Sequence, residues 1–281
     1  MKLSALIDQY LAASPEIRGT QRSTLLRMAK EPIGKHTLPL TAKNVIDHMK
    51  ARNLTVQPAT ANIDLVYLRG MLDYAKHGLG IDGVTTAPVD DAMPILTRQR
   101  LIGTSETRTR IPTPDEHAAI VAHIRKRDPV MADLIDFGYE SGRRISESCR
   151  LLWDDLDTEK KTILVRDLKH PRKKTGHNKR AALPDPAFAI VQRQTRTTTL
   201  QDERIFKVLP STAKAVYRRA CRTLGITGLH LHDSRAALVT RLLDAGYTES
   251  QVMLVTLHDT TRMVRSRYNR LKADDFPRSI A

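Results

Sequence analysis

The chain has 281 residues, enough for one or two domains, and 41% of them are apolar, which excludes a disordered chain. Aromatic residues make up only 4%, so the apolar content rests on aliphatic side chains and favours helices over a β-sandwich. The formal net charge of +15 and the pI of about 10.0 indicate a polyanionic partner such as nucleic acid.

The positive charge is concentrated after residue 100, where 33 Lys and Arg face 22 Asp and Glu, compared with 13 against 9 before it. The two cysteines, Cys149 and Cys221, make neither a zinc site nor a disulfide framework, so we interpret both as buried or incidental thiols in a reduced cytosol. No signal-peptide core follows Met1, and no apolar run approaches the ~20 residues of a membrane span. We therefore expect a cytoplasmic protein.

Four helices are predicted in the first part of the chain. Apolar residues at helical spacing indicate helices over 3–13 and 20–31, and Thr41 is a candidate cap for a third. The clearest helix begins at Pro58, and its expected buried stripe consists of Ile63, Val66, Tyr67, Gly70, Met71 and Tyr74. These elements predict a helical domain over 1–85. Periodicity then fades among glycines and prolines, so 86–110 is predicted to be an interdomain linker.

A second domain is predicted over 111–281. Thr113 and Pro114, followed by two acids, form a strong helix start. Further helices are expected over 130–139, from Ile145, and over 186–196, 211–224, 233–245, 248–256 and 260–271. Two short strands, 162–165 and 180–183, enclose a turn-rich segment. The predicted fold class is mainly α with a small β-hairpin or sheet.

The first candidate site motif is Gly142-Arg143-Arg144-Ile145-Ser146-Glu147. Gly142 permits a tight turn, and Arg144 then lies at a helix start that favours an anion. Glu147 is placed to hold either the helix start or the guanidinium of Arg144. A single arginine on a turn is usually only solvated, so the weight of this motif depends on its companions.

Two further motifs could contact a phosphate. The turn-rich segment and the second strand carry cations that can contact a nucleic-acid backbone, namely Arg172, Lys173, Lys174, Lys179 and Arg180. His232 and Arg235 are three residues apart, so they share a face at a helix start and can approach one phosphate. His230 is a competing histidine, but only His232 has an arginine at that offset.

The last motif contains His258 and, ten residues later, Tyr268. Tyr268 is flanked by Arg265 and Arg267, and this electropositive setting favours phenolate character and contact with a phosphate backbone. None of the other six tyrosines has such partners. Two arginines, two histidines and a tyrosine can together cleave a phosphodiester without metal.

The ordered motifs, in the segments SGRRISESC, LHLHDSRAALV and TLHDTTRMVRSRY, resemble the tyrosine recombinase (phage integrase) family from about Arg110 to the C-terminus. The resemblance implies a catalytic set of Arg144, Lys169, His232, Arg235, His258 and Tyr268. Lys173 or Lys174 is the alternative to Lys169. The family usually has Leu-Gly-His with Tyr about nine residues on, whereas here Leu257 directly precedes His258.

By this resemblance, Arg144 and Arg235 clamp the phosphate oxygens and His258 adds a donor. His232 accepts the proton of Tyr268, which forms a 3′-phosphotyrosine, and Lys169 protonates the released 5′-oxygen. The implied enzyme is a DNA strand-transferase that needs no metal, ATP or other cofactor. It would act as a homotetramer on two sites of double-stranded DNA, with accessory DNA-bending proteins as further candidate partners. Residues 1–85 would form its core-binding domain and 111–281 its catalytic domain.

Three alternatives remain open from the sequence. A type IB topoisomerase uses similar residues but relaxes supercoils without a second DNA site. A DNA-binding protein that has lost catalysis would account for the altered residues around His258. A helix-turn-helix over 233–256 is weaker, because it leaves His232 and Arg235 unexplained.

Overall fold

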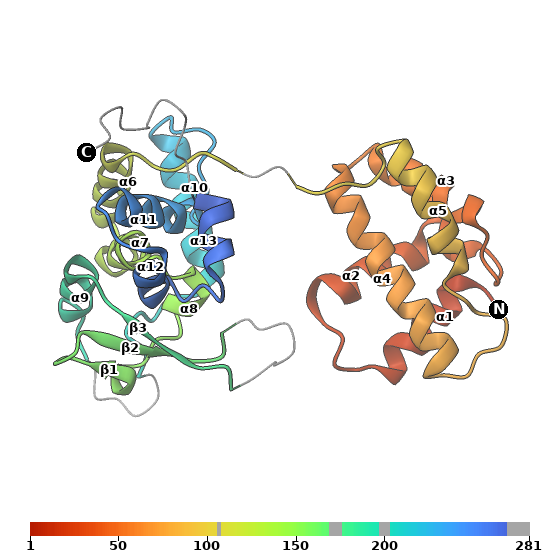
Figure 1. Ribbon diagram of the computed structural model, residues 1–281, viewed down its shortest axis with the longest axis horizontal. Helices are drawn as coiled ribbons and strands as arrows, with labels where there is room; N and C mark the ends of the chain where they lie inside the picture. The colour runs from red at the N-terminus through yellow and green to blue at the C-terminus, as the bar shows by residue number, and fades with distance from the viewer. Residues whose placement is uncertain (106–107, 169–175, 197–202, 269–281) are drawn as a thin grey trace, which may run out of the picture. The chain divides into compact units, whose positions relative to one another are not determined.

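The computed structural model describes residues 1–105, 108–168, 176–196 and 203–268, and for 265–268 it describes the backbone alone. The chain divides into two compact units, Met1–Thr107 and Arg108–Ala281. Helices dominate both units, and the second also holds a three-stranded antiparallel sheet, which confirms the predicted fold class (Figure 1). Within the described ranges, no helix is both long enough and apolar enough to cross a bilayer.

Unit 1 consists of five helices and one 3-10 turn around a single apolar core. Its elements are α1 (Leu3–Ala13), α2 (Gly19–Lys30), η1 (Pro32–Lys35), α3 (Ala42–Asn53), α4 (Pro58–His77) and α5 (Ala87–Arg98). Thr41 caps α3 as predicted, since its hydroxyl accepts a hydrogen bond from the backbone N–H of Asn44. The helices predicted over 3–13, over 20–31 and from Pro58 are also present.

The buried face of α4 differs from the predicted stripe. Ile63, Val66 and Tyr74 are exposed, and of the predicted set only Met71 is buried. The face turned to the core carries Ala61, Asp64, Leu65, Leu68, Leu72 and Ala75 instead. Both stripes have helical spacing; the second places its leucines and alanines in the core of unit 1, where the buried Asp64 accepts two hydrogen bonds from Arg27 of α2, at 2.7 and 2.6 Å.

The linker predicted over 86–110 contains a helix, α5, which packs against α3. Val89, Ala92 and Leu96 of α5 are buried in the core of unit 1. The prolines that suggested a loop are compatible with the helix: Pro88 lies in its first turn, where no N–H is needed, and Pro94 removes one internal bond. The two units divide after Thr107.

Unit 2 contains the segments that carry the candidate site. Its helices are α6 (Pro114–Arg125), α7 (Pro129–Ser141), α8 (Ile145–Ser148), α9 (Asp185–Gln192), α10 (Pro210–Thr223), α11 (Asp233–Asp244), α12 (Glu249–Thr256) and α13 (Thr261–Tyr268). A 3-10 turn, η2 (Trp153–Asp155), precedes β1 (Leu156–Asp157), which pairs with β2 (Thr162–Val165); β2 in turn pairs with β3 (Lys179–Ala182). The strands predicted over 162–165 and near 180–183 are therefore present.

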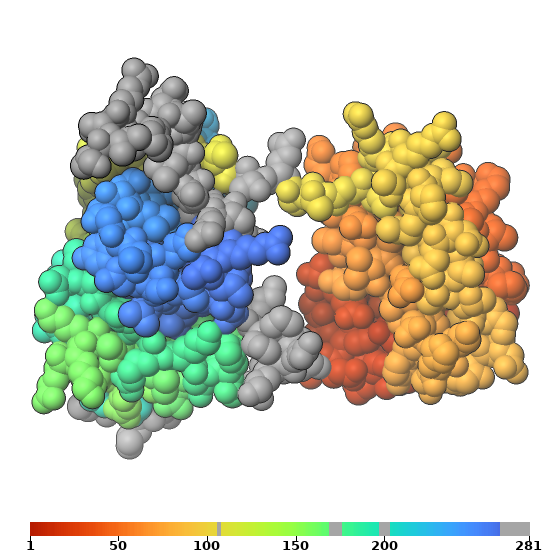
Figure 2. All heavy atoms as spheres, viewed as in Figure 1, coloured from red at the N-terminus to blue at the C-terminus, as the bar shows by residue number. Residues whose placement is uncertain are grey.

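Helix α7 lies within the core of unit 2 and contacts α6, α9 and α11. Nine of its residues are buried, and near its C-terminal end the carbonyl oxygen of Tyr139 accepts a 3.0 Å hydrogen bond from Arg241 of α11. Strand β3 contacts α12, which brings the sheet next to the segment that carries His258. In the space-filling view, the blue atoms of α11 to α13 gather in the middle of the visible face of unit 2, beside the green atoms of the sheet (Figure 2). Both cysteines are buried free thiols, as predicted.

Candidate active site

The turn after α7 places the first arginine motif. Gly142 ends the helix in the left-handed conformation, with φ +63°. A Cβ atom at this position would lie 3.0 Å from Leu238 Cδ2 and 3.5 Å from Thr256 Cγ2. The left-handed backbone angle therefore favours glycine, and a Cβ here would also make a tight contact with Leu238 of α11.

Arg144 follows this turn and begins the short helix α8. Its Nη1 donates to Glu147 Oε1 at 2.6 Å, and its backbone N–H donates to Glu147 Oε2 at 3.2 Å. Glu147 is buried, whereas the Arg144 side chain remains 34% exposed. The carboxylate thus holds the guanidinium from inside and leaves part of it open to a ligand.

Arg235 lies in the first turn of α11 and is buried. Its Nη1 donates to the carbonyl oxygen of Gly142 at 2.7 Å. The loop before α11 is fixed by Asp233, whose Oδ2 accepts from the backbone N–H of His230 at 2.8 Å and from Arg108 at 3.0 Å. These bonds place His232 and Arg235 beside the turn that carries Arg144.

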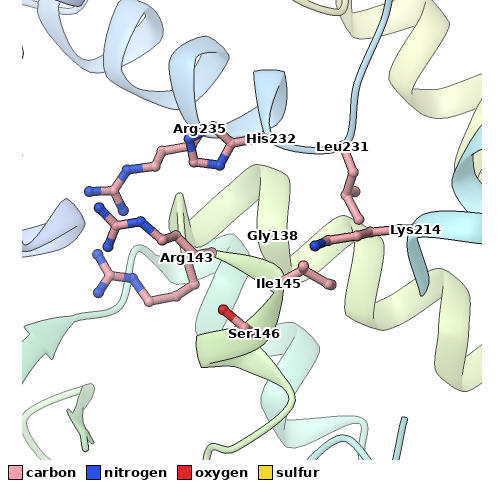
Figure 3. Close-up of a pocket in the computed structure, with 9 residues that line it drawn as sticks. Gly138, Arg143, Ile145, Ser146, Lys214, Leu231, His232 and Arg235 are labelled. Carbon is pink, nitrogen blue, oxygen red and sulfur yellow. The ribbon is translucent and has the colours of Figure 1, made fainter. Parts of the chain in front are cut away.

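A cavity of about 220 Å³ brings these residues together (Figure 3). Its lining consists of Gly138, Arg143, Arg144, Ile145, Ser146, Lys214, Leu231, His232 and Arg235. In the close-up, the guanidinium groups of Arg143 and Arg235 extend to the same side of the pocket. His230 is exposed and lines a neighbouring cavity, whereas the cavity lined by Arg144 and Arg235 includes His232 and not His230.

His258 is buried just after α12. Its Nδ1 lies 2.8 Å from the hydroxyl of Thr256. The carbonyl oxygen of Val255, the residue before Thr256, accepts a hydrogen bond from Nη2 of Arg143. Leu257 has φ +55° and ψ +41°, the left-handed conformation that glycine adopts most easily. The departure from Leu-Gly-His therefore changes the side chain but keeps the backbone geometry for which glycine is the usual choice.

The charges of the site are unequal in number, because three arginines surround one carboxylate. Burial lowers the pKa of Arg143 to about 9, and the nearby charge of Arg235 adds to this effect, yet the group stays protonated at neutral pH. Burial alone would raise the pKa of Glu147, but the charges of Arg143 and Arg144 and the hydrogen bond from Arg144 bring it below its usual value. Glu147 is therefore an anion that partly balances a cluster suited to a phosphate.

Of the candidate DNA-binding residues, Lys179 and Arg180 lie on β3. Lys179 Nζ forms an ion pair with Asp259 at 2.7 Å, and Arg180 Nη1 donates to Thr162 Oγ1 at 3.2 Å. Lys179 thus connects the sheet to the residue after His258. Lys169, Arg172, Lys173 and Lys174 lie outside the described residues, and for Arg265, Arg267 and Tyr268 only the backbone position on α13 is described.

Three residues near the site were not singled out from the sequence. Arg143 occupies the variable place of its motif, Lys214 of α10 lines the pocket, and Thr256 contacts His258. Lys214 is one of several cations in α10, and nothing in their spacing set it apart. Thr256 likewise looked like any threonine at the end of a helix. Among the described residues, no group of three or more His, Cys, Asp or Glu side chains could hold a metal ion.

Comparison with known proteins identifies the family. The family model described as "Phage integrase family" matches residues 111–274. The shufflon-specific DNA recombinase of Escherichia coli is 24% identical over 97% of this chain and 70% of its own length. A putative integrase/recombinase of Haemophilus influenzae is 27% identical over 110 residues, 38% of this chain and 29% of the relative.

Solved structures share the fold of the whole chain. The Tn1549 transposon integrase bound to transposon right-end DNA is 16% identical, with a TM-score of 0.73 over 98% of this chain and 97% of that one. A lambda integrase dimer bound to a core site is also 16% identical, with a TM-score of 0.72 over 100% of this chain and 79% of that one. Because the family model covers more than half of the chain and its match includes every motif of the candidate site, the chain belongs to the phage integrase family and is a site-specific tyrosine recombinase.

Proposed function

We propose that this recombinase cleaves one DNA strand by attack of Tyr268 on a phosphodiester and rejoins it to another strand through a 3′-phosphotyrosine. The observation that supports it most is the pocket that brings Arg144, His232 and Arg235 together from segments some ninety residues apart. Cationic donors that are held in place before the substrate arrives stabilise charge developing on phosphate oxygens without reorganising. The arginines of the pocket are cationic donors held in place in this way.

The proposed roles follow from the chemistry of each group. Arg144 and Arg235 donate to the non-bridging oxygens of the scissile phosphate, and His258 adds a third donor. The Oη of Tyr268 attacks phosphorus while His232 accepts its proton, and the bond to the 5′-oxygen breaks. Lys169 donates a proton to that leaving oxygen. The phosphotyrosine conserves the phosphodiester energy, so religation to a 5′-hydroxyl needs no ATP.

The proposed DNA interface extends from the pocket along the sheet. Lys179 and Arg180 of β3 belong to it, together with Arg172, Lys173, Lys174, Arg265 and Arg267. Unit 1 would act as the core-binding domain and unit 2 as the catalytic domain. Since a lambda integrase tetramer bound to a Holliday junction has the same fold, with a TM-score of 0.70, we propose a tetramer on two paired DNA sites. Accessory DNA-bending proteins would complete the complex in the cytoplasm.

A covalent-trapping assay tests this proposal. Wild type and Tyr268→Phe are incubated with nicked duplexes taken from the DNA that flanks the gene and are then run on denaturing gels. A protein–DNA adduct in wild type that is absent in Tyr268→Phe is the expected result. Retarded DNA on native gels without an adduct from wild type would contradict catalysis on those sites and favour a binding protein.

A second assay separates recombination from relaxation. Two duplexes that carry the trapped site are mixed with wild type, and the exchange of labelled strands between them is followed; in parallel, a supercoiled plasmid is tested for relaxation. We expect strand exchange between the duplexes. An adduct with plasmid relaxation and no exchange would instead indicate a topoisomerase-like activity.

A further inference from the structure

Thr256 and His258 form a buried pair at the end of α12. The Thr256 side chain is fully inside the protein, and His258 is 5% exposed. Thr256 Oγ1 lies 2.8 Å from the carbonyl oxygen of Val252 and 2.8 Å from Nδ1 of His258. The hydroxyl therefore stands between one backbone acceptor and one imidazole nitrogen.

The hydrogens of this arrangement can be assigned from the inventory of donors and acceptors. A threonine hydroxyl has one hydrogen, and a carbonyl oxygen can only accept. The hydroxyl hydrogen must point to Val252, since two oxygens 2.8 Å apart would otherwise repel each other. Oγ1 then accepts from His258, so Nδ1 of His258 carries a hydrogen.

The backbone makes this contact possible. Side chains two residues apart on a helix point in different directions and do not meet. Here the left-handed Leu257 reverses the chain, and the imidazole of His258 folds back onto Thr256. The helix end itself is held at the candidate active site by the bond from Arg143 to Val255. Gly142 lies close by, since a Cβ added at that position would lie 3.5 Å from the methyl carbon of Thr256.

We infer that Thr256 is a positioning residue of the strand-transfer site, which holds the His258 ring in one orientation with its hydrogen on Nδ1. Any contact of His258 with the substrate phosphate is then made through Nε2. The inference rests on the proposed role of His258 in catalysis, and it deepens that role by naming the group that selects the tautomer. Thr256 itself touches no reacting atom.

Two substitutions separate the hydroxyl from the shape of the side chain. Thr256→Val keeps the volume and β-branching but removes the hydroxyl, and Thr256→Ser keeps the hydroxyl. Nitrogen NMR of 15N-histidine-labelled full-length protein reads which ring nitrogen carries the hydrogen, and a His258→Gln sample assigns the signal. The measurement is made without DNA, at a pH where the ring is neutral, with thermal unfolding to verify that each variant folds.

We expect a hydrogen on Nδ1 in wild type and Thr256→Ser, and a mixed or Nε2-protonated ring in Thr256→Val. Adduct formation in the trapping assay should fall by about tenfold or more in Thr256→Val and remain near the wild-type rate in Thr256→Ser, since one positioning hydrogen bond is lost. An unprotonated Nδ1 in wild type, or undiminished cleavage by Thr256→Val, would overturn the inference. If wild type forms no adduct at all, the proposed function fails, while the tautomer is still read directly by NMR.

Discussion

Arg235 and Gly142 are 93 residues apart in the chain, and the guanidinium of one donates a 2.7 Å hydrogen bond to the carbonyl oxygen of the other. The bond ties the first turn of α11 to the end of α7, two residues before Arg144. A buried guanidinium that donates one N–H to a carbonyl oxygen is held in one orientation before any ligand arrives. The relative position of the two arginines that we expect to clamp a phosphate is therefore set by a backbone atom between them.

The first prediction concerns the close approach at Gly142. Gly142→Ala should lower the free energy of unfolding by about 1 kcal/mol, because an L-residue must adopt the left-handed conformation. It should also slow cleavage by roughly tenfold, because the new methyl group makes a tight contact with Leu238 and displaces α11, the helix that carries Arg235. Urea unfolding and single-turnover cleavage measure the two effects.

Gly225→Ala is the matched control for this prediction. Gly225 has φ +68°, close to that of Gly142, but nothing lies within 4 Å of its Cβ position. The control should show the same loss of stability with unchanged cleavage. Equal cleavage by the Gly142 and Gly225 variants would show that the close packing at Gly142 has no part in catalysis.

The second prediction concerns the left-handed Leu257. Leu257→Ala and Leu257→Gly both remove the packed side chain, so their difference reports the backbone alone. We expect the glycine variant to be more stable than the alanine variant by about 1 kcal/mol. Leu254, exposed within α12, provides a control of opposite sign, because there alanine should be more stable than glycine by about 1 kcal/mol. A more stable alanine at 257 would rule out the left-handed backbone in solution.

The third prediction concerns Glu147, the buried counter-ion of the arginines. Glu147→Gln should lower the free energy of unfolding by about 3 kcal/mol at neutral pH, because it leaves the buried cation of Arg143 without its carboxylate. Exposed Glu159 serves as the control, and Glu159→Gln should change stability by less than about 0.5 kcal/mol. Urea unfolding of the three proteins gives the values.

The pH dependence of the Glu147 effect follows from the direction of its pKa shift. The pKa of Glu147 is lower in the folded than in the unfolded protein, so its stabilising contribution is complete above the ordinary glutamate pKa. The contribution is lost as the pH falls through the folded-state pKa. The difference between wild type and Glu147→Gln should therefore shrink in acid, and a difference that stayed constant down to acid unfolding would contradict the assignment.

The fourth prediction concerns the salt dependence of DNA binding. If Arg180 contacts a phosphate, Arg180→Ala should make the slope of log affinity against log salt concentration shallower by about 0.9. Asp259→Asn should raise the affinity for DNA, since it releases Lys179 from its ion pair. Fluorescence anisotropy over a salt series measures both, and an unchanged slope in Arg180→Ala would remove this residue from the interface.

Much of the fold could be predicted from local patterns in the sequence. The cap at Thr41, the helix start at Thr113–Pro114 and the apolar, β-branched run at 162–165 depend on neighbours a few residues away, and each predicted element is present in the structure. The order of the arginine, histidine and tyrosine motifs likewise identified the family that the comparisons support. The cap, the helix start and the strand are encoded by short spacing and the motifs by their order along the chain, and a single sequence displays both directly.

Other features depended on residues that meet only after folding. Both stripes of α4 have helical spacing, and the buried one is the stripe that packs against the other helices of unit 1, where Asp64 meets Arg27 of α2. The helix α5 is stable in a proline-containing segment because α3 offers its apolar residues a surface. Periodicity describes one element by itself and contains no information about the element that will cover it.

The sequence alone determined the composition of the candidate site and the order of its residues along the chain. Only the tertiary structure decided that Arg143 is buried against Val255, that Lys214 reaches the pocket and that Thr256 holds His258. The first two contacts require atoms from segments far apart in the sequence to come together, and the third requires the left-handed turn at Leu257 that ends α12. The sequence specifies the chemistry of each side chain, whereas packing determines where the side chain points and which residues it contacts.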